Sequence, residues 1–228
     1  ICLLPFWKFK VPKKKYWLPL LFFSICMGFL TNFFMNLSIN ESSIVSPIII
    51  GSQLAIPFAI LLSSLFLREK VNLKKWLLIF ISFFGVILLG FDPLIQNEFF
   101  ALTLISFMAF FYASAQVFSR YLKDLNVTLT NAVMSFIGFI CLIVISYFFE
   151  GDTIESIKSI SVQSWLIILH SGIFVSIGAH MSMFYLYKIY PVNKIFPFYA
   201  LFPVFGVLIS FIIFYEIPTL ITIIGGLI

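Results

Sequence analysis

Seven runs of mostly apolar residues, each long enough to cross a membrane as a helix, follow one another along the chain. A helix needs about 20 residues to cross the roughly 30 Å of hydrocarbon in a bilayer. Only 10% of the residues are charged and the mean hydropathy is +1.13, far from the values of soluble domains. We therefore predict an all-α integral membrane protein, a polytopic helical bundle. The predicted spans are 16 to 39, 44 to 67, 73 to 91, 99 to 119, 127 to 149, 163 to 187 and 195 to 215.

Two shorter apolar segments stand at the ends of the sequence, "ICLLPFW" at the start and "TLITIIGGLI" at the end. Neither is long enough to span a bilayer alone. The sequence also begins without a methionine. We therefore expect both ends to be truncated spans, which gives seven complete and two partial spans here and at least nine in the natural protein.

The positive charges predict the orientation in the membrane, because short loops rich in Lys and Arg stay on the cytoplasmic side. Thirteen of the fourteen Lys and Arg residues fall in alternate loops, and Lys158 alone lies in the opposite set. We expect the protein in the cell inner membrane, with loops 8–15 and 68–75 cytoplasmic and loops 92–98 and 150–162 external. The net charge of +5 is spread over four short loops, so the surface is not predicted to bind nucleic acid.

One pattern occurs twice: a proline, a dozen mostly apolar residues and then a glutamate. It runs from Pro57 to Glu69 and from Pro203 to Glu216. The first copy is predicted to end inside the cell and the second outside. Inverted copies of one unit are typical of secondary transporters. Laying Pro57 on Pro203 also places Gln53 on Tyr199, and a shift of 149 aligns "MNLSINES" with "FYLYKIYP" at the end of the preceding span.

The segments "YALFPVFGVLISFIIFYEIPTLITIIGGLI" and "PFAILLSSLFLREKVNLKKWLLIFISFFGVILLG" resemble the ends of the two repeats in the EamA family of the drug/metabolite transporter superfamily. The resemblance implies ten helices in two inverted five-helix repeats, here at 1–91 and 99–228, both truncated. It also implies transport, most often export of an amino acid or related metabolite. Leu78 stands where the family pattern has a glycine, although Gly85 and Gly90 remain.

Polar residues within spans are costly in lipid and therefore indicate function. Tyr199 and Gln53 each lie four residues before a proline, on one helix face with it. A proline in a span removes a backbone hydrogen bond, so Pro57 and Pro203 are predicted to bend their helices beside a cavity. The alternatives are static kinks for the prolines and helix-to-helix hydrogen bonds for the polar side chains. The candidate cavity residues are Asn32, Asn36, Gln53, Tyr112, Gln116, His180 and Tyr199.

All nine acids lie in loops or at span ends, which suits a neutral or zwitterionic solute. Glu69 and Glu216 are expected to have structural roles, hydrated or paired with a loop cation such as Lys70 or Lys74. Coupling to protons would have to use His180 or His170, and the alternative is that transport is not directly coupled to protons. The three cysteines lack metal-ligand spacing, so neither a metal nor a cofactor is expected.

These patterns together predict a secondary transporter that moves a small solute by alternating access and is not an enzyme. An intramembrane enzyme is one alternative, because Ser176 and His180 lie four residues apart, but no HExxH or GxSxG motif occurs. An uptake carrier for a vitamin- or nucleotide-like metabolite is another, and a channel lacks a filter sequence. The expected partners are the solute and the lipid bilayer, with a homodimer left open.

Overall fold

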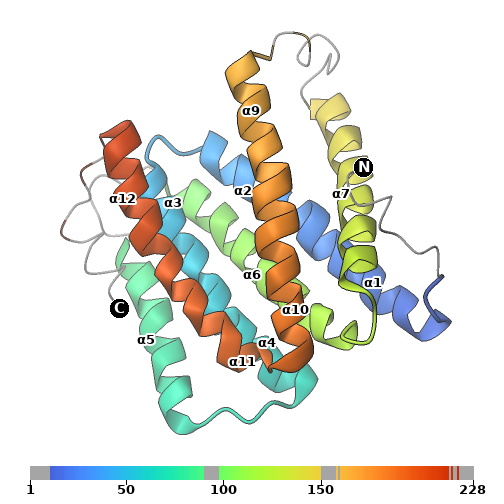
Figure 1. The fold of residues 1–228 in the computed structure, drawn as a ribbon. Helices are drawn as coiled ribbons and strands as arrows, with labels where there is room; N and C mark the ends of the chain where they lie inside the picture. Colours follow the sequence, from blue (N-terminus) through green and yellow to red (C-terminus); the bar gives the residue numbers. More distant parts are fainter. Residues whose placement is uncertain are drawn as a thin grey trace. The chain divides into compact units, whose positions relative to one another are not determined.

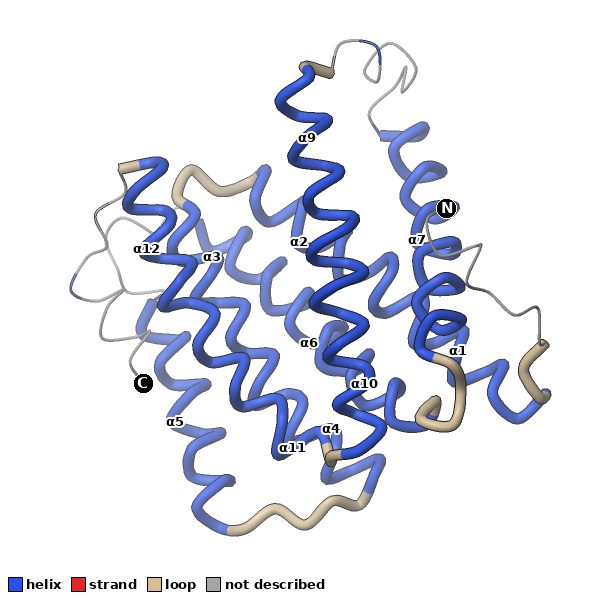
Figure 2. The backbone as a smooth tube through the Cα atoms, viewed as in Figure 1, coloured by secondary structure: helices blue, strands red, loops and turns tan. Residues whose placement is uncertain are grey.

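The computed structural model describes residues 11–89, 98–149, 158, 160–215, 217 and 220. Within these ranges the regular elements are all helices, as the tube in Figure 2 shows. The chain forms two compact units, each made of two segments distant in sequence. Unit 1 consists of Ile1–Phe29 and Phe118–Tyr190, and unit 2 consists of Leu30–Val117 and Pro191–Ile228.

Unit 1 is built mainly from α1 and α7 and from a long helical rod. In Figure 1 this rod runs through α9 and α10 without a break. The Ser161 side chain accepts a hydrogen bond of 3.1 Å from the Ser164 N–H, which satisfies one of the free amides at the start of α9. The elements are η2 Lys14–Tyr16, α1 Trp17–Ser24, the π-helical η3 Ile25–Leu30, the end of α6 Phe99–Tyr121, α7 Val127–Phe149, α9 Val162–His170, the π-helical η6 Ser171–His180 and α10 Met181–Ile189.

Two glycines allow the start of unit 1 to approach α7 closely. A Cβ added to Gly28 would lie 2.4 Å from the Met134 carbonyl oxygen, and one added to Gly138 would lie 2.3 Å from the Gly28 carbonyl oxygen. The two helix backbones are therefore in direct contact. In lipid the hydrophobic effect does not drive helices together, because the lipid tails are as apolar as the side chains. Helices associate there through close packing, which small residues at the contact allow.

Unit 2 packs the segments that contain both proline-to-glutamate patterns. Helix α12 runs alongside α3 in Figure 1, and a Cβ added to Gly206 would lie only 2.8 Å from Ile49 Cγ2. The elements are α2 Thr31–Asn40, α3 Val45–Gly51, the 3₁₀-helical η4 Ser52–Leu54, α4 Ala55–Leu67, α5 Leu73–Leu89, most of α6, α11 Val192–Ile195, the 3₁₀-helical η7 Phe196–Leu201 and α12 Phe202–Phe214.

Five helical stretches of the described chain are long and apolar enough to cross a membrane: Lys14–Asn40, Ile48–Leu67, Phe99–Tyr121, Val127–Phe149 and Val162–Ile189. They coincide with five of the seven predicted spans. Helix α5, with 17 residues, and the succession of η7 and α12 lie in the other two predicted ranges. The prediction of an all-α polytopic membrane protein is confirmed.

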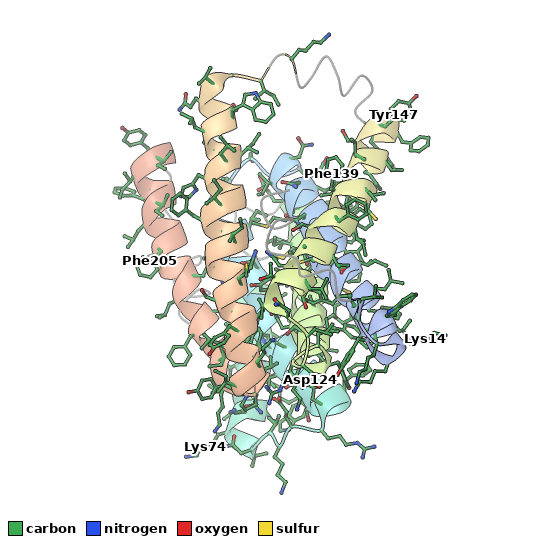
Figure 3. The ribbon with its side chains drawn as sticks, turned by 45° about the vertical axis from the view of Figure 1, so that its right-hand side comes forward. Lys14, Lys74, Asp124, Phe139, Tyr147 and Phe205 are labelled. Carbon is green, nitrogen blue, oxygen red and sulfur yellow. The ribbon has the colours of Figure 1, made fainter. Side chains whose placement is uncertain are left out.

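The apolar residues of α7 lie mostly on the outside of unit 1. Only 11% of the most apolar window of this helix is buried, against 67% for α6. Phe139 and Tyr147, labelled in Figure 3, are exposed. Large exposed apolar surfaces are unusual for a soluble protein, so these faces are suited to lipid.

Irregular helix turns recur at the spacings found in the sequence. Shifting η3 (Ile25–Leu30) by 149 residues gives 174–179, which falls within η6 (Ser171–His180). Shifting η4 (Ser52–Leu54) by 146 residues gives 198–200, within η7 (Phe196–Leu201). The same local departures from α-helix thus occur in both copies of the sequence pattern.

A left-handed residue precedes the glutamate position in both copies. Arg68 has φ 53° and ends α4, and Tyr215 has φ 55° and ends α12. Left-handed backbone is uncommon for residues other than glycine, so its presence in both copies indicates a shared chain reversal. The Glu69 N–H completes the first reversal by donating to the Ser63 carbonyl, six residues earlier, at 3.3 Å.

Candidate functional site

The helix breaks in unit 2 place Gln53 and Tyr199 where the backbone hydrogen bonding changes. In a regular α-helix the N–H of residue i bonds to the carbonyl of residue i−4. Because proline has no N–H, Pro57 leaves the Gln53 carbonyl without that partner, and Pro203 does the same for Tyr199. The chain responds with 3₁₀ turns, in which the Phe202 N–H bonds to the Tyr199 carbonyl. Whether the helix axes also bend at the two prolines stays a prediction.

Three aromatic rings gather around that of Tyr199, and we call the four residues the aromatic cluster: Tyr112, Phe196, Tyr199 and Phe202. The ring of Tyr199 lies 5.4 Å from that of Tyr112, 5.5 Å from that of Phe196 and 5.3 Å from that of Phe202, centroid to centroid. Tyr112 also lies 5.8 Å from Phe196. These separations are typical of favourable ring contacts, so η7, α12 and α6 meet through aromatic side chains, two of which carry a hydroxyl.

Polar groups from η4 border this cluster. The Ser52 side chain shares a hydrogen bond with Tyr199, and its hydroxyl donates to the Ile49 carbonyl at 2.6 Å. Gln53 Nε2 lies 3.5 Å from Ser52 Oγ, a long and weak hydrogen bond. Gln53 Oε1 is buried and has no hydrogen-bond partner. The structure therefore links Gln53 to Tyr199 through Ser52 and leaves one buried acceptor free.

An unsatisfied buried acceptor costs roughly 1–3 kcal/mol. A ligand that donates an N–H or O–H to Gln53 Oε1 would recover this free energy, while its apolar part would contact the aromatic cluster. No charged residue belongs to the cluster or to η4, so the arrangement is suited to holding a neutral or zwitterionic molecule by hydrogen bonds and ring contacts.

The other predicted site residues are distributed differently. Gln116 is fully buried on α6, one turn after Tyr112 on the same helix. Asn32 and Asn36 on α2 are exposed. His180 belongs to unit 1, where it ends η6. The structure thus brings Gln53, Tyr112 and Tyr199 together in one unit.

Glu69 contacts a helix start instead of a loop cation. Its carboxylate accepts a hydrogen bond of 3.3 Å from the Asn193 N–H at the start of α11. Lys75 Nζ donates to the Asn193 carbonyl at 3.2 Å. Residues on either side of the turn between α4 and α5 therefore bind both backbone groups of Asn193 and anchor the start of α11. A carboxylate is suited to this role, because the first amides of a helix have no partner within the helix. Glu216 lies outside the described residues.

Sequence reasoning missed a second anchor formed by Glu98. Its carboxylate accepts hydrogen bonds from the hydroxyls of Ser42 and Ser43 and one of 2.8 Å from the Ser43 N–H. These groups come just before α3, so Glu98 ties the start of α6 to the turn that leads into α3. Its position directly before an apolar run was the available signal, because acids favour helix starts.

The fold and this site define a polytopic helical membrane protein whose broken helices carry polar and aromatic side chains inside unit 2. A scan against protein-family models matches the EamA-like transporter family over residues 1–91 and 99–228. The chain belongs to the EamA-like transporter family. No curated protein matches it. The predicted resemblance is confirmed, and the protein is a membrane transporter of the drug/metabolite transporter type.

Proposed function

We propose that this protein is a secondary transporter that moves a small neutral or zwitterionic metabolite, an amino acid or a close relative, by alternating access. The observation that carries the proposal is the free buried oxygen of Gln53 beside the hydrogen-bonded pair of Ser52 and Tyr199. Family membership supports transport. The free acceptor supports a solute with an N–H donor, such as an amino group.

The proposed roles follow from the contacts. Gln53 Oε1 accepts a hydrogen bond from the solute, the Tyr199 hydroxyl oxygen accepts another, and Tyr112 contributes an aromatic surface. Asn32, Asn36 and Gln116 are proposed to line the pathway. The carbonyls that lack α-helical partners because of Pro57 and Pro203 are further acceptors, as in transporters that bind solute at broken helices.

The proposed mechanism uses the helix breaks as the places where spans change shape. The 3₁₀ turns before each proline lack part of the regular hydrogen bonding, so their backbone can reorganise at a lower cost than an intact α-helix. Glu69 and Glu98 anchor turns at span ends, and Glu216 is proposed to act like Glu69 in the second repeat. Two inverted repeats would then offer similar exits on both sides of the membrane.

Export across the inner membrane is the proposed direction. It rests on what is most frequent among transporters of this family type. The proposed orientation has the cationic loops in the cytoplasm, because thirteen of the fourteen Lys and Arg residues fall in alternate loops.

Counterflow in proteoliposomes tests the proposal. Vesicles that contain the full-length protein and an unlabelled mixture of neutral amino acids are diluted into the same mixture labelled with ¹⁴C at low concentration. A transporter should accumulate label transiently, since exchange is driven by the internal pool. A channel would equilibrate label without a transient maximum, and an enzyme would change the chemical identity of the label. Either outcome would overturn the proposal.

A further inference from the structure

Among the described residues of unit 1, two side chains, His180 and Ser24, each have a buried polar atom without a hydrogen-bond partner. These atoms are Nδ1 of His180 and the hydroxyl oxygen of Ser24. Ser24 is fully buried. Buried polar groups are nearly always satisfied, and exceptions often have a functional cause. The imidazole is therefore the group in unit 1 that most needs an explanation beyond packing.

Aromatic rings hold the His180 ring in place. The ring of Phe184, one turn further along, is stacked on it at 6.1 Å with an interplanar angle of 15°. Phe184 in turn contacts Phe23 edge to face at 5.2 Å, and Ser24 follows Phe23 in the chain. A cation over an aromatic face is stabilised within about 6 Å. Phe184 is thus placed to stabilise a protonated imidazole without forming a hydrogen bond to it.

His180 also ends a π-helical segment, while Ser24 directly precedes the other one. Short π-helical stretches are rare and frequently lie at functional sites. The two segments occupy positions related by the 149-residue shift. His180 Nδ1 and the Ser24 hydroxyl therefore both lie at the edge of a segment with irregular helical hydrogen bonding. A small change in that bonding would move both atoms.

No acid stands near enough in the chain to neutralise His180. The described spanning elements of unit 1 contain no carboxylate, and Asp124 in the turn before α7 accepts a hydrogen bond from the Tyr16 hydroxyl at 3.0 Å. Lys188 donates to the Leu125 carbonyl. A proton on His180 would therefore add a net charge. Several titratable or charged groups lie on the elements around η6 and α10. They are His170 on α9, Arg120 and Tyr121 at the end of α6, Cys141 and Tyr147 on α7, Tyr185, Tyr187 and Lys188 on α10, and Cys26 on η3.

We propose that His180 is the proton-binding site that couples transport to the pH gradient, an inference that rests on the proposed transport function. The neutral ring has one nitrogen with a free lone pair. Water on one side of the membrane delivers a proton, an N–H bond forms there, and the same bond breaks when the proton leaves on the other side. Each solute exported is exchanged for one proton that enters. A charge on His180 without a fixed partner makes the protonated and the neutral protein favour different conformations. Coupling requires this difference, because a bound proton shifts a conformational equilibrium only if it binds the two conformations with different affinity.

The test uses the full-length protein in proteoliposomes with the membrane potential held at zero by valinomycin and equal potassium. With one proton exchanged per solute, a gradient of about one pH unit should support about a tenfold concentration ratio of ¹⁴C-labelled neutral amino acids. In His180→Gln this ratio should fall to one, while counterflow at equal pH persists. His170→Gln is the matched control, because His170 is exposed on α9 and should keep the tenfold ratio. A His180→Gln protein that keeps the ratio would overturn the proposal.

A second measurement applies if His180→Gln does not fold. The chain has two histidines, so His170→Gln leaves His180 as the single imidazole. Its protonation can then be followed by NMR of ¹⁵N-labelled histidine in the presence of the amino-acid mixture. We expect one titration between about pH 4 and 9, and a ring that stays neutral throughout would overturn the proton site. Absence of counterflow in the wild type would instead contradict the transport function, so the two failures are distinguishable.

Discussion

At the scale of single residues, Gln53 and Tyr199 are the side chains whose chemistry is least explained by packing. We predict that Gln53→Leu and Tyr199→Phe lower counterflow or shift solute preference. Stability should change little, because hydrogen bonds between side chains in a membrane are worth only about 0.6 kcal/mol on average. Counterflow rates and thermal unfolding of the purified variants measure both effects.

Tyr185→Phe is the matched control for Tyr199→Phe. Tyr185 lies on α10 in unit 1 and is exposed, so loss of its hydroxyl should leave transport unchanged. If Gln53→Leu and Tyr199→Phe both transport at the wild-type rate, the two residues have only packing roles and the proposed site is wrong.

Glu98 gives the structure a stability that depends on pH. Burial by itself would raise the pKa of this carboxyl, but hydrogen bonds from Ser42 and Ser43 outweigh burial and lower its pKa below the ordinary value of 4.5. A group with a lowered pKa in the folded state stabilises the fold fully above its unfolded pKa and loses this contribution as the pH falls through the folded pKa. The contribution from Glu98 should therefore be present above about pH 4.5 and disappear in more acidic solution.

We predict that Glu98→Gln lowers the unfolding temperature at neutral pH and reduces its fall below pH 4.5. The four tryptophans allow unfolding to be followed by fluorescence in detergent. Glu41→Gln serves as control, because Glu41 is exposed. Equal acid sensitivity in Glu98→Gln and the wild type would show that the Ser42 and Ser43 contacts contribute nothing to the pH dependence.

At the scale of helices, the contact between Gly28 and Gly138 should be the most sensitive packing point of unit 1. An added methyl group would meet backbone atoms at 2.4 Å and 2.3 Å, and backbone cannot move aside as a flexible side chain can. Gly28→Ala and Gly138→Ala should each destabilise the fold by about 1–3 kcal/mol, the usual cost of overpacking. Thermal unfolding of the purified variants measures this loss.

Gly172 supplies the control, since a Cβ there has nothing within 4 Å. Gly172→Ala adds the same methyl group to a helical glycine of the same unit and should unfold near the wild-type temperature. If all three alanine variants unfold at the wild-type temperature, helix approach at Gly28 does not limit stability.

The sequence predicted the spans well because the bilayer requires about 20 apolar residues per helix whatever the packing. It located the 3₁₀ turns indirectly, through Pro57 and Pro203, since a missing N–H must disturb the turn before it. The π-helical segments η3 and η6 had no such signal. The link from Gln53 through Ser52 to Tyr199 could not be predicted either, because it depends on how η4 and η7 pack in three dimensions.

At the scale of the whole molecule, the compact units and the sequence repeats divide the chain differently. The repeats are predicted at 1–91 and 99–228, but each unit combines segments from both. A movement of one repeat against the other would break contacts inside both units, such as the one between Gly28 and Gly138. We therefore expect the units, rather than the repeats, to be the bodies that move in alternating access. The repeat pattern in the sequence cannot predict these units, because it shows which segments are alike and not which segments pack together.

The orientation in the membrane is predicted from the cations, which, apart from Lys158, fall at one end of each unit in the part of the chain that the structure describes. In unit 1 the Lys188 ammonium reaches the turn before α7 and the Arg120 guanidinium donates to the Tyr187 carbonyl. Lys14 and Asp124 lie at this same end in Figure 3, far from Tyr147. In unit 2 the α4–α5 turn, rich in Lys and Arg, meets the start of α11. Within each unit taken by itself, these contacts join span ends that the loop charges predict to lie on the same side.

We predict that these cationic ends face the cytoplasm, because Lys and Arg in short loops resist translocation. In a protein whose three cysteines are replaced by alanine, single cysteines are introduced as Val71→Cys and Thr153→Cys. Val71 is chosen because it removes no cation and spares Asn72, whose side chain accepts a hydrogen bond from the Lys75 N–H at 2.9 Å. A membrane-impermeant maleimide should label Thr153→Cys in intact cells and Val71→Cys only after permeabilisation. The opposite pattern would invert the topology, and with it the direction in which the proposed proton exchange could drive export.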